Sequence, residues 1–127
     1  MFSHIVLGSD DIPATRKFYD AALAPLGHAA GSETPDGSRL VYYAQTGILM
    51  ITRPLNGEPA TYANGGTVGF AAPDPAAVDA FHAAGLAAGG TDEGAPGSRP
   101  AISGSYAAYL RDPTGNKIVA WCVKQDS

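Results

Sequence analysis

Few side chains in this 127-residue chain could carry out chemistry, and they stand far apart in the sequence. The chain has three histidines, His4, His28 and His82, and one cysteine, Cys122. No Ser/His/Asp order, phosphate-binding glycine loop or pair of carboxylates stands out in it. Each candidate residue therefore has to be weighed against an ordinary structural role.

His4 lies within a largely apolar segment, Phe2 to Leu7, whose composition predicts a buried strand. Alternation along a strand puts His4 and Val6 on one face and Ile5 and Leu7 on the other. We expect the bulkier pair to lie under a helix, so that His4 faces a cavity. Three roles remain open for His4, which is the best candidate catalytic residue: general base, hydrogen-bond donor to a ligand, or cap of the strand.

The other two histidines and the cysteine have structural interpretations. His28 follows the first predicted helix, where the negative end of the helix dipole favours an imidazole. His82 lies at the edge of the apolar face of the second helix, which predicts packing or a helix–sheet hydrogen bond. Cys122 alternates with Trp121 on the last strand, so we expect it to pack under a helix while Trp121 faces the cavity.

Arg99 lies in a polar segment, residues 91–104, that we expect to form a long loop. Long loops in small domains often carry function. Arg99 could bind an anionic group of a substrate at the mouth of the cavity, or it could be a solvated surface charge. The sequence favours neither role.

The elements that must position these residues occur twice. The segment 4–27 aligns without a gap on the segment 67–90, with Asp11 on Asp74, Phe18 on Phe81 and Gly27 on Gly90. Such a repeat indicates two copies of one small unit that share a core.

Each unit has the predicted order β-α-β-β-β. In the first unit, a helix over 12–26 follows the N-cap Asp11, residues 28–30 and a turn over 31–38 come next, and two strands span 39–44 and 48–53. In the second, a strand over 67–71 precedes a helix over 75–86, and two further strands span 105–111 and 117–123.

Composition and charge exclude several classes of protein. The formal net charge is −4 and no cluster of Lys and Arg is present, so we expect no nucleic-acid partner. No apolar run approaches ~20 residues, so we expect no membrane span and no export signal. A single cysteine cannot form an internal disulfide, which favours a reducing, cytoplasmic location.

Three segments resemble the vicinal oxygen chelate superfamily, which holds glyoxalases, extradiol dioxygenases, and fosfomycin- and bleomycin-resistance proteins. They are the opening strand 4–7, the helix segment with Phe18-Tyr19 and its end at 23–27, and the turn Arg111-Asp112-Pro113-Thr114-Gly115-Asn116-Lys117-Ile118. The resemblance implies an α+β fold in which two βαβββ modules form an open, U-shaped barrel around a shared cavity. We expect a single domain over 1–127, with modules at 1–53 and 65–123 and a linker over 54–64.

The resemblance also implies positions for a metal, and most of them hold no ligand here. His4 matches the first family ligand, but Thr67 occupies the equivalent position of the second module and Val119 replaces the family's Glu. The strand 48–52 offers neither carboxylate nor imidazole. A divalent site needs about three protein ligands, so we expect no cofactor, with a divalent metal as the alternative.

We therefore expect a metal-free protein that binds a small organic molecule in the cavity between the modules. The alternative is a lyase or dioxygenase-type enzyme of the glyoxalase (lactoylglutathione lyase) kind, with an atypical metal site or acid–base chemistry at His4. Family members commonly pair, which predicts a homodimer. The predicted ligand-binding residues are His4, Thr67, Arg99, Val119 and Trp121, with further apolar lining from Val6, Tyr43, Met50 and Tyr109.

Overall fold

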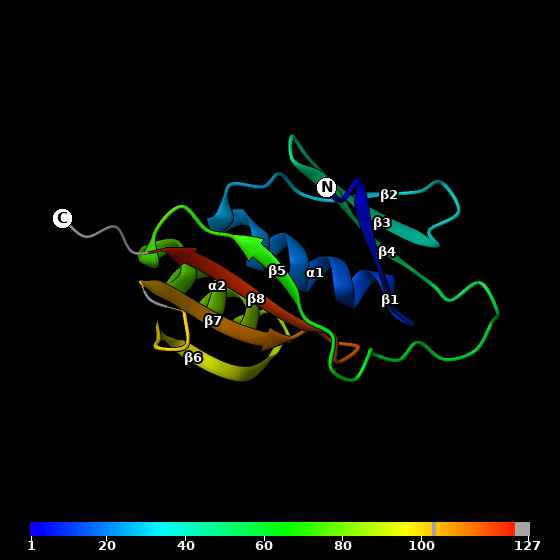
Figure 1. The fold of residues 1–127 in the computed structure, drawn as a ribbon. Helices are drawn as coiled ribbons and strands as arrows, with labels where there is room; N and C mark the ends of the chain where they lie inside the picture. Colours follow the sequence, from blue (N-terminus) through cyan, green and yellow to red (C-terminus); the bar gives the residue numbers. More distant parts are fainter. Residues whose placement is uncertain (103, 124–127) are drawn as a thin grey trace.

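The computed structural model describes residues 1–102 and 104–123, and it confirms two βαβββ modules in an α+β fold. Each module has one four-stranded mixed sheet and one α-helix, and the sheets stay open rather than closing into a barrel (Figure 1). The first module comprises β1 (His4–Gly8), α1 (Ile12–Leu23), the 3₁₀ turn η1 (Ala24–Leu26), β2 (Ser32–Glu33), β3 (Arg39–Ala44) and β4 (Gly47–Thr52). The second comprises β5 (Val68–Ala71), α2 (Pro75–Ala87), β6 (Thr91–Arg99), β7 (Ser105–Arg111) and β8 (Lys117–Val123).

The two sheets have the same topology. Sheet A has the order β1-β4-β3-β2 and sheet B the order β5-β8-β7-β6. In both, the first strand of the module pairs in parallel with the last, as His4 with Ile48 and Val68 with Ile118. The other pairs are antiparallel. The sequence repeat is therefore a structural repeat.

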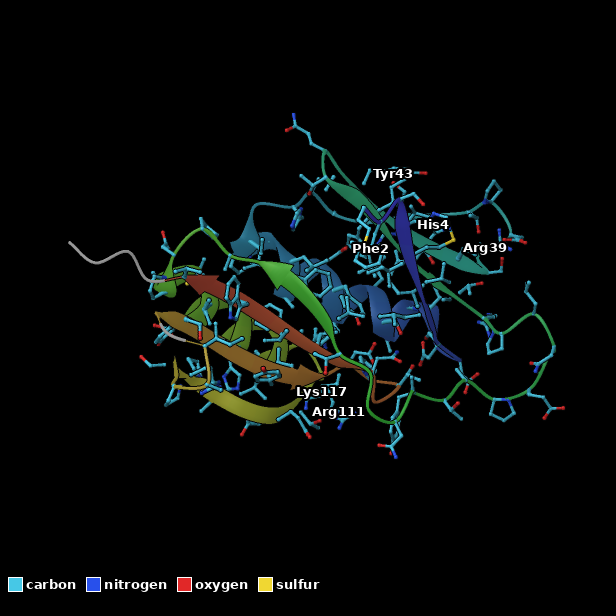
Figure 2. The ribbon with its side chains drawn as sticks, in the orientation of Figure 1. Phe2, His4, Arg39, Tyr43, Arg111 and Lys117 are labelled. Atoms are coloured by element: carbon cyan, nitrogen blue, oxygen red, sulfur yellow. The ribbon has the colours of Figure 1, made fainter. Side chains whose placement is uncertain are left out.

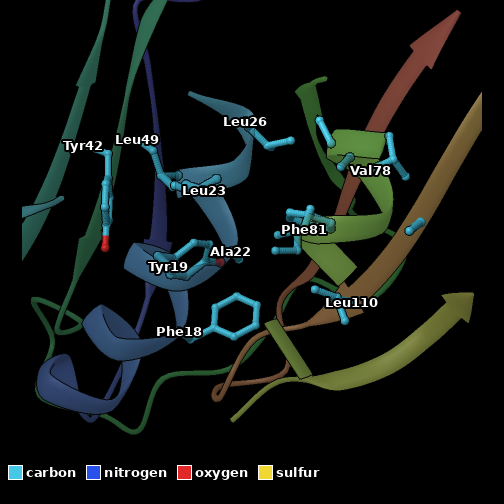
Figure 3. Packing of buried hydrophobic residues seen from close by; sticks show 14 of the residues in the cluster. Phe18, Tyr19, Ala22, Leu23, Leu26, Tyr42, Leu49, Val78, Phe81 and Leu110 are labelled. Carbon is cyan, nitrogen blue, oxygen red and sulfur yellow. The ribbon is translucent and has the colours of Figure 1, made fainter. Parts of the chain in front are cut away.

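The two helices lie between the sheets and share one core with both of them (Figure 3). Tyr42 and Leu49 of sheet A pack on the α1 side, and Leu110 of sheet B packs on the α2 side. Phe18 of α1 reaches into the second module, where a Cβ added to Gly85 would come within 3.1 Å of its ring. Because a side chain at Gly85 would collide there, this glycine permits the close packing of the two modules.

Strand alternation has the phase that the sequence predicts. Ile5 and Leu7 of β1 and Phe70 of β5 pack against the core, so each sheet has an inner face toward the helices and an outer face away from them. Cys122 belongs to the core, as expected. Trp121 is half-buried and lies on the outer face of β8, not beneath a helix.

Both predicted helix N-caps are present, and the first helix ends differently from the prediction. The Asp11 carboxylate accepts a hydrogen bond from the backbone of Ala14 at 3.0 Å, and Asp74 caps α2 in the same way. The predicted helix over 12–26 is α-helical only to Leu23 and then tightens into η1. Pro25 has no N–H to continue the α-helical pattern, and Gly27 ends the turn at φ 95°.

The prediction of a loop over 91–104 is wrong for most of that segment, because Thr91–Arg99 forms the edge strand β6. Its glycines and Pro96 conceal the strand, since they provide no alternating apolar side chains. The pairing with β7 shifts register on both sides of Gly94, which fits a proline on an edge strand. In the first module, the short strand β2 likewise falls inside the predicted turn over 31–38. No helix in the described residues is long and apolar enough to cross a membrane.

The turn between β7 and β8 ties the second module to the first through a buried carboxylate. Tyr19 of α1 donates its hydroxyl to Asp112 Oδ2 at 2.7 Å, and Asn116 Nδ2 donates to the same oxygen at 2.9 Å and to the Gly8 carbonyl at 3.2 Å. Asp112 Oδ1 accepts from the backbone N–H groups of Thr114, Gly115 and Asn116. Burial, with Asp112 beside it, raises the pKa of Tyr19 well above its ordinary value, so its hydroxyl stays a donor.

We expect Tyr19→Phe to lower the free energy of unfolding by about 1–3 kcal/mol, since it removes one donor from a buried carboxylate. Urea denaturation measures the change. The matched control is Tyr106→Phe, which removes a hydroxyl that donates to Asp79 in an exposed hydrogen bond and should cost much less than Tyr19→Phe. Equal losses in the two variants would contradict the role given to Asp112.

Candidate functional site

A cavity of about 280 Å³ lies between the two modules. Its first-module wall comes from the start of β1, from β3 and β4, and from the end of α1. Its second-module wall is β5, residues 68–71. Among the lining residues are Phe2, His4, Leu26, His28, Tyr42, Tyr43, Leu49 and Phe70. The cavity is thus shared by the two modules.

The cavity wall is largely apolar, with a few polar groups. The Ser3 hydroxyl lies 2.8 Å from His4 Nδ1, so one nitrogen of this exposed imidazole is held by a neighbouring side chain. Tyr42 donates its hydroxyl to Asp20 Oδ1 at 2.6 Å, and burial and this hydrogen bond raise the pKa of Tyr42 above its ordinary value. Tyr42 therefore remains protonated and contributes an aromatic surface rather than a base.

The cavity contains only one of the five predicted ligand-binding residues. His4 lines it, whereas Thr67, Arg99, Val119 and Trp121 are not among its lining residues. Figure 2 shows Phe2, His4 and Tyr43 together at sheet A, with Lys117 and Arg111 at the end of sheet B beside the turn between β7 and β8. The outer faces of the two sheets turn away from each other because both helices lie between them.

Sequence reasoning missed most of the lining. Of the further apolar residues expected there, only Tyr43 lines the cavity, and Val6, Met50 and Tyr109 do not. Leu26 and His28 were missed because the repeat pairs equivalent strands but does not show that the end of α1 closes the gap between them. The sequence carries one signal of this closure, which is the proline-interrupted segment at the end of the first helix.

The other predicted roles can be checked in the same way. His82 Nε2 lies 2.8 Å from Asp92 Oδ1, which is the predicted helix–sheet hydrogen bond, here between α2 and β6. This hydrogen bond is the main cause that lowers the pKa of Asp92. Arg99 lies at the end of β6, outside the cavity, and not in a loop at its mouth.

The residues at the family's metal positions do not fit a metal ion. His4 belongs to sheet A, whereas Thr67 and Val119 belong to the second module, and Val119 has no donor atom. Over residues 1–102 and 104–123, no three His, Cys, Asp or Glu side chains gather in a group that could hold a metal. The donor set does not supply the three ligands that a divalent ion needs.

Comparison with known proteins agrees with this architecture. Residues 1–120 match the family model of the Glyoxalase/Bleomycin resistance protein/Dioxygenase superfamily. The chain belongs to this superfamily. No curated protein matches this superfamily member.

Solved structures of the superfamily resemble the chain over nearly its whole length. A glyoxalase/bleomycin resistance protein from Albidiferax ferrireducens T118 is 49% identical, with a TM-score of 0.88 and 99% of each chain covered. A lactoylglutathione lyase from Agrobacterium tumefaciens is 26% identical, with a TM-score of 0.66, over 95% of this chain and 92% of the other. The fold is shared by a glyoxalase-related enzyme from Fulvimarina pelagi, which is 17% identical. Its TM-score is 0.75, and the match covers 95% of this chain and 86% of the other.

We expect the purified protein to retain no stoichiometric Zn, Ni, Mn or Fe after dialysis, because Thr67 and Val119 cannot complete a site with His4. Elemental analysis measures this directly. One equivalent of metal per chain that is lost in a His4→Ala variant would contradict the prediction.

Proposed function

We propose that this superfamily member binds a small, uncharged, largely apolar organic molecule in the cavity between its modules, without a metal ion. The observation that carries the proposal is the cavity itself, about 280 Å³ in volume with mostly apolar and aromatic lining. Ligand pockets in proteins are typically apolar clefts of about 300 Å³ or more with a few polar groups. A molecule of two or three rings is the size that such a cavity accommodates.

The driving force would be burial of apolar surface, at about 25 cal/mol per Å² removed from water. Phe2 and Tyr43 provide exposed aromatic walls, and Leu26 and Leu49 provide buried aliphatic ones. His4, held by Ser3, offers a polar group that can orient the ligand.

The second candidate function is a lyase or dioxygenase-type reaction with acid–base chemistry at His4. It is favoured by the position of His4 in the cavity wall and by the hydrogen bond that holds its ring. The two candidates differ in what His4→Gln should do. A binding protein would keep its affinity to within a few-fold, whereas an enzyme would lose turnover of its substrate by about 100-fold or more.

Binding of the uncharged probe N-phenyl-1-naphthylamine, followed by its fluorescence, tests the cavity. We expect saturable binding that the double variant Phe2→Ala/Tyr43→Ala weakens about tenfold or more, because both exposed rings line the cavity. The matched control is Leu55→Ala, an exposed apolar residue of the linker that lies outside the cavity lining. Unsaturable binding, or equal affinity in the wild type and the double variant, would contradict the proposal.

We also propose that two copies of the chain pair through the outer face of sheet A. The resemblance to the superfamily implies pairing, as expected from the sequence. Val6 on this face remains 47% exposed, and Tyr43, which also borders the cavity, is 68% exposed. Val41, Ile48 and Met50 add further apolar side chains to the face, and Arg39 and His4 lie on it as well. An apolar face of this kind typically marks an interaction site.

Sedimentation analysis tests the pairing. We expect a dimer that Val6→Glu shifts toward monomer by about tenfold or more in dissociation constant, since the variant places charges in an apolar interface. Val6 does not line the cavity, so this variant separates pairing from ligand binding. A wild-type monomer at every accessible concentration would rule out the pairing.

We also propose that the protein is cytoplasmic. Its one cysteine, Cys122, is a buried free thiol in the core. A chain without an internal disulfide suits a reducing compartment.

A further inference from the structure

Three dipeptides of the chain join an aspartate or an asparagine to a glycine: Asp36-Gly37, Asn56-Gly57 and Asn64-Gly65. In such a pair the backbone nitrogen of the glycine can attack the side-chain carbonyl carbon of the residue before it and close a five-membered ring. A glycine has no Cβ to obstruct this approach. Whether the ring closes then depends on what holds the attacking nitrogen and the side chain, and the three sites differ in this respect.

The turn at Asp36 holds both reacting groups. The Gly37 N–H donates to the Thr34 carbonyl at 2.8 Å, so the attacking nitrogen is engaged. Asp36 Oδ1 accepts from the Ser38 backbone at 3.0 Å, from the Ser38 hydroxyl at 2.8 Å and from the Thr34 hydroxyl at 2.9 Å. These hydrogen bonds, first those from Ser38, lower the pKa of Asp36 to about 2. An ionised carboxylate resists a nucleophile, so this site is protected.

The turn at Asn56 holds both groups in the same way. The Gly57 N–H donates to the Pro54 carbonyl at 3.2 Å, and Asn56 Oδ1 accepts from the Glu58 N–H at 3.0 Å. Both hydrogen bonds must break before the Gly57 nitrogen can reach the side chain of Asn56. Since each contributes only a modest net free energy, they slow the reaction at Asn56 without preventing it.

The turn at Asn64 holds neither group. It closes through the residue after Gly65, because the Gly66 N–H donates to the Ala63 carbonyl at 3.0 Å. Over residues 1–102 and 104–123, no hydrogen bond engages the Gly65 N–H or the side chain of Asn64. Both residues are exposed, and a Cβ added at Gly65, where φ is 95°, would meet no atom within 4 Å. Water and the side chain therefore both have access to the Gly65 nitrogen.

The third asparagine of the chain, Asn116, is protected by burial. Its side-chain nitrogen donates to Asp112 Oδ2 at 2.9 Å and to the Gly8 carbonyl at 3.2 Å, so the amide is held inside the protein. The residue that follows it is Lys117, whose side chain obstructs the backbone nitrogen in a way that a glycine does not. Asn64 is thus the asparagine with the least protection.

We propose that Asn64 is a site of spontaneous deamidation and that it reacts before the other asparagines of the folded chain. The Gly65 nitrogen loses its proton and forms a bond to Asn64 Cγ. The bond from Cγ to the side-chain amide nitrogen breaks, and that nitrogen leaves as ammonia after taking up a proton. Water then opens the cyclic imide at either of its carbonyl carbons, which leaves an aspartate or an isoaspartate. Water is the one co-reactant, and no electrons are exchanged.

The position of Asn64 determines what this modification changes. Asn64 lies in the linker between β4 and β5 (Figure 1), and it belongs neither to the core nor to the lining of the cavity. The reaction adds one negative charge to a chain of formal net charge −4, and the isoaspartate form lengthens the backbone ahead of β5 by one methylene. We therefore expect the fold to persist, and the proposal does not depend on the function of the cavity.

Incubation of the full chain at mildly alkaline pH tests the proposal, with ammonia release measured and the modified residue located by peptide mapping under acidic conditions. In the folded chain we expect Asn64 to react about tenfold or more faster than Asn56, because two hydrogen bonds must first break at Asn56. The rate should rise with pH, since ring closure needs a deprotonated nitrogen. In concentrated urea both turns are lost, and the two rates should become comparable.

Asn64→Gln should abolish the early release of ammonia, because the longer side chain would have to close a less favourable six-membered ring. The matched control is Asn56→Gln, at the other exposed Asn-Gly pair of the linker, which should keep the wild-type rate. Circular dichroism verifies that both variants are folded. Reaction at Asn56 that is as fast as at Asn64 in the folded chain would overturn the proposal. So would an undiminished preference for Asn64 in urea, or a folded chain that releases no ammonia in the time that the chain in urea needs to react completely.

Discussion

The buried carboxylate of Asp112 holds the two modules in their relative position. A buried charge is costly unless it is fully hydrogen-bonded, and Asp112 accepts from a tyrosine hydroxyl, a side-chain amide and three backbone N–H groups. These donors come from α1 and from the turn between β7 and β8, and Asn116 extends the network to the end of β1. Any rotation of one module against the other would break hydrogen bonds to a charge that water cannot easily reach.

The placement of the site follows from this constraint. With α1 and α2 held side by side in the middle, the inner faces of both sheets are used for the core. What remains is a cavity between the modules and two outer faces with different chemistry. The outer face of sheet A is apolar around Val6, and that of sheet B is cationic around Tyr109. One repeated unit thus provides three different surfaces.

Much of the fold could be predicted from the sequence, because its signals are local. The N-caps Asp11 and Asp74, the turn after Asp112 and the alternation that buries Cys122 all depend on neighbouring residues. Strand β6 could not be predicted, since its glycines and Pro96 follow no period and the strand forms only by pairing with β7. The end of α1 was predicted one turn too long as α-helix because Pro25 follows apolar residues of helical spacing. The location of the site could not be predicted from the sequence repeat either. The repeat makes His4 and Thr67 equivalent, but equivalence does not place them in one cavity.

In the function proposed above, the cavity between the modules is a binding site to which both contribute. The most direct measurement is the change in backbone amide chemical shifts on titration with N-phenyl-1-naphthylamine. We predict that shifts appear together, with one dissociation constant, at His4 and Ile5 of β1 and at Val68 to Phe70 of β5. Shifts confined to one module, or located on the outer face of β8 around Trp121, would contradict it.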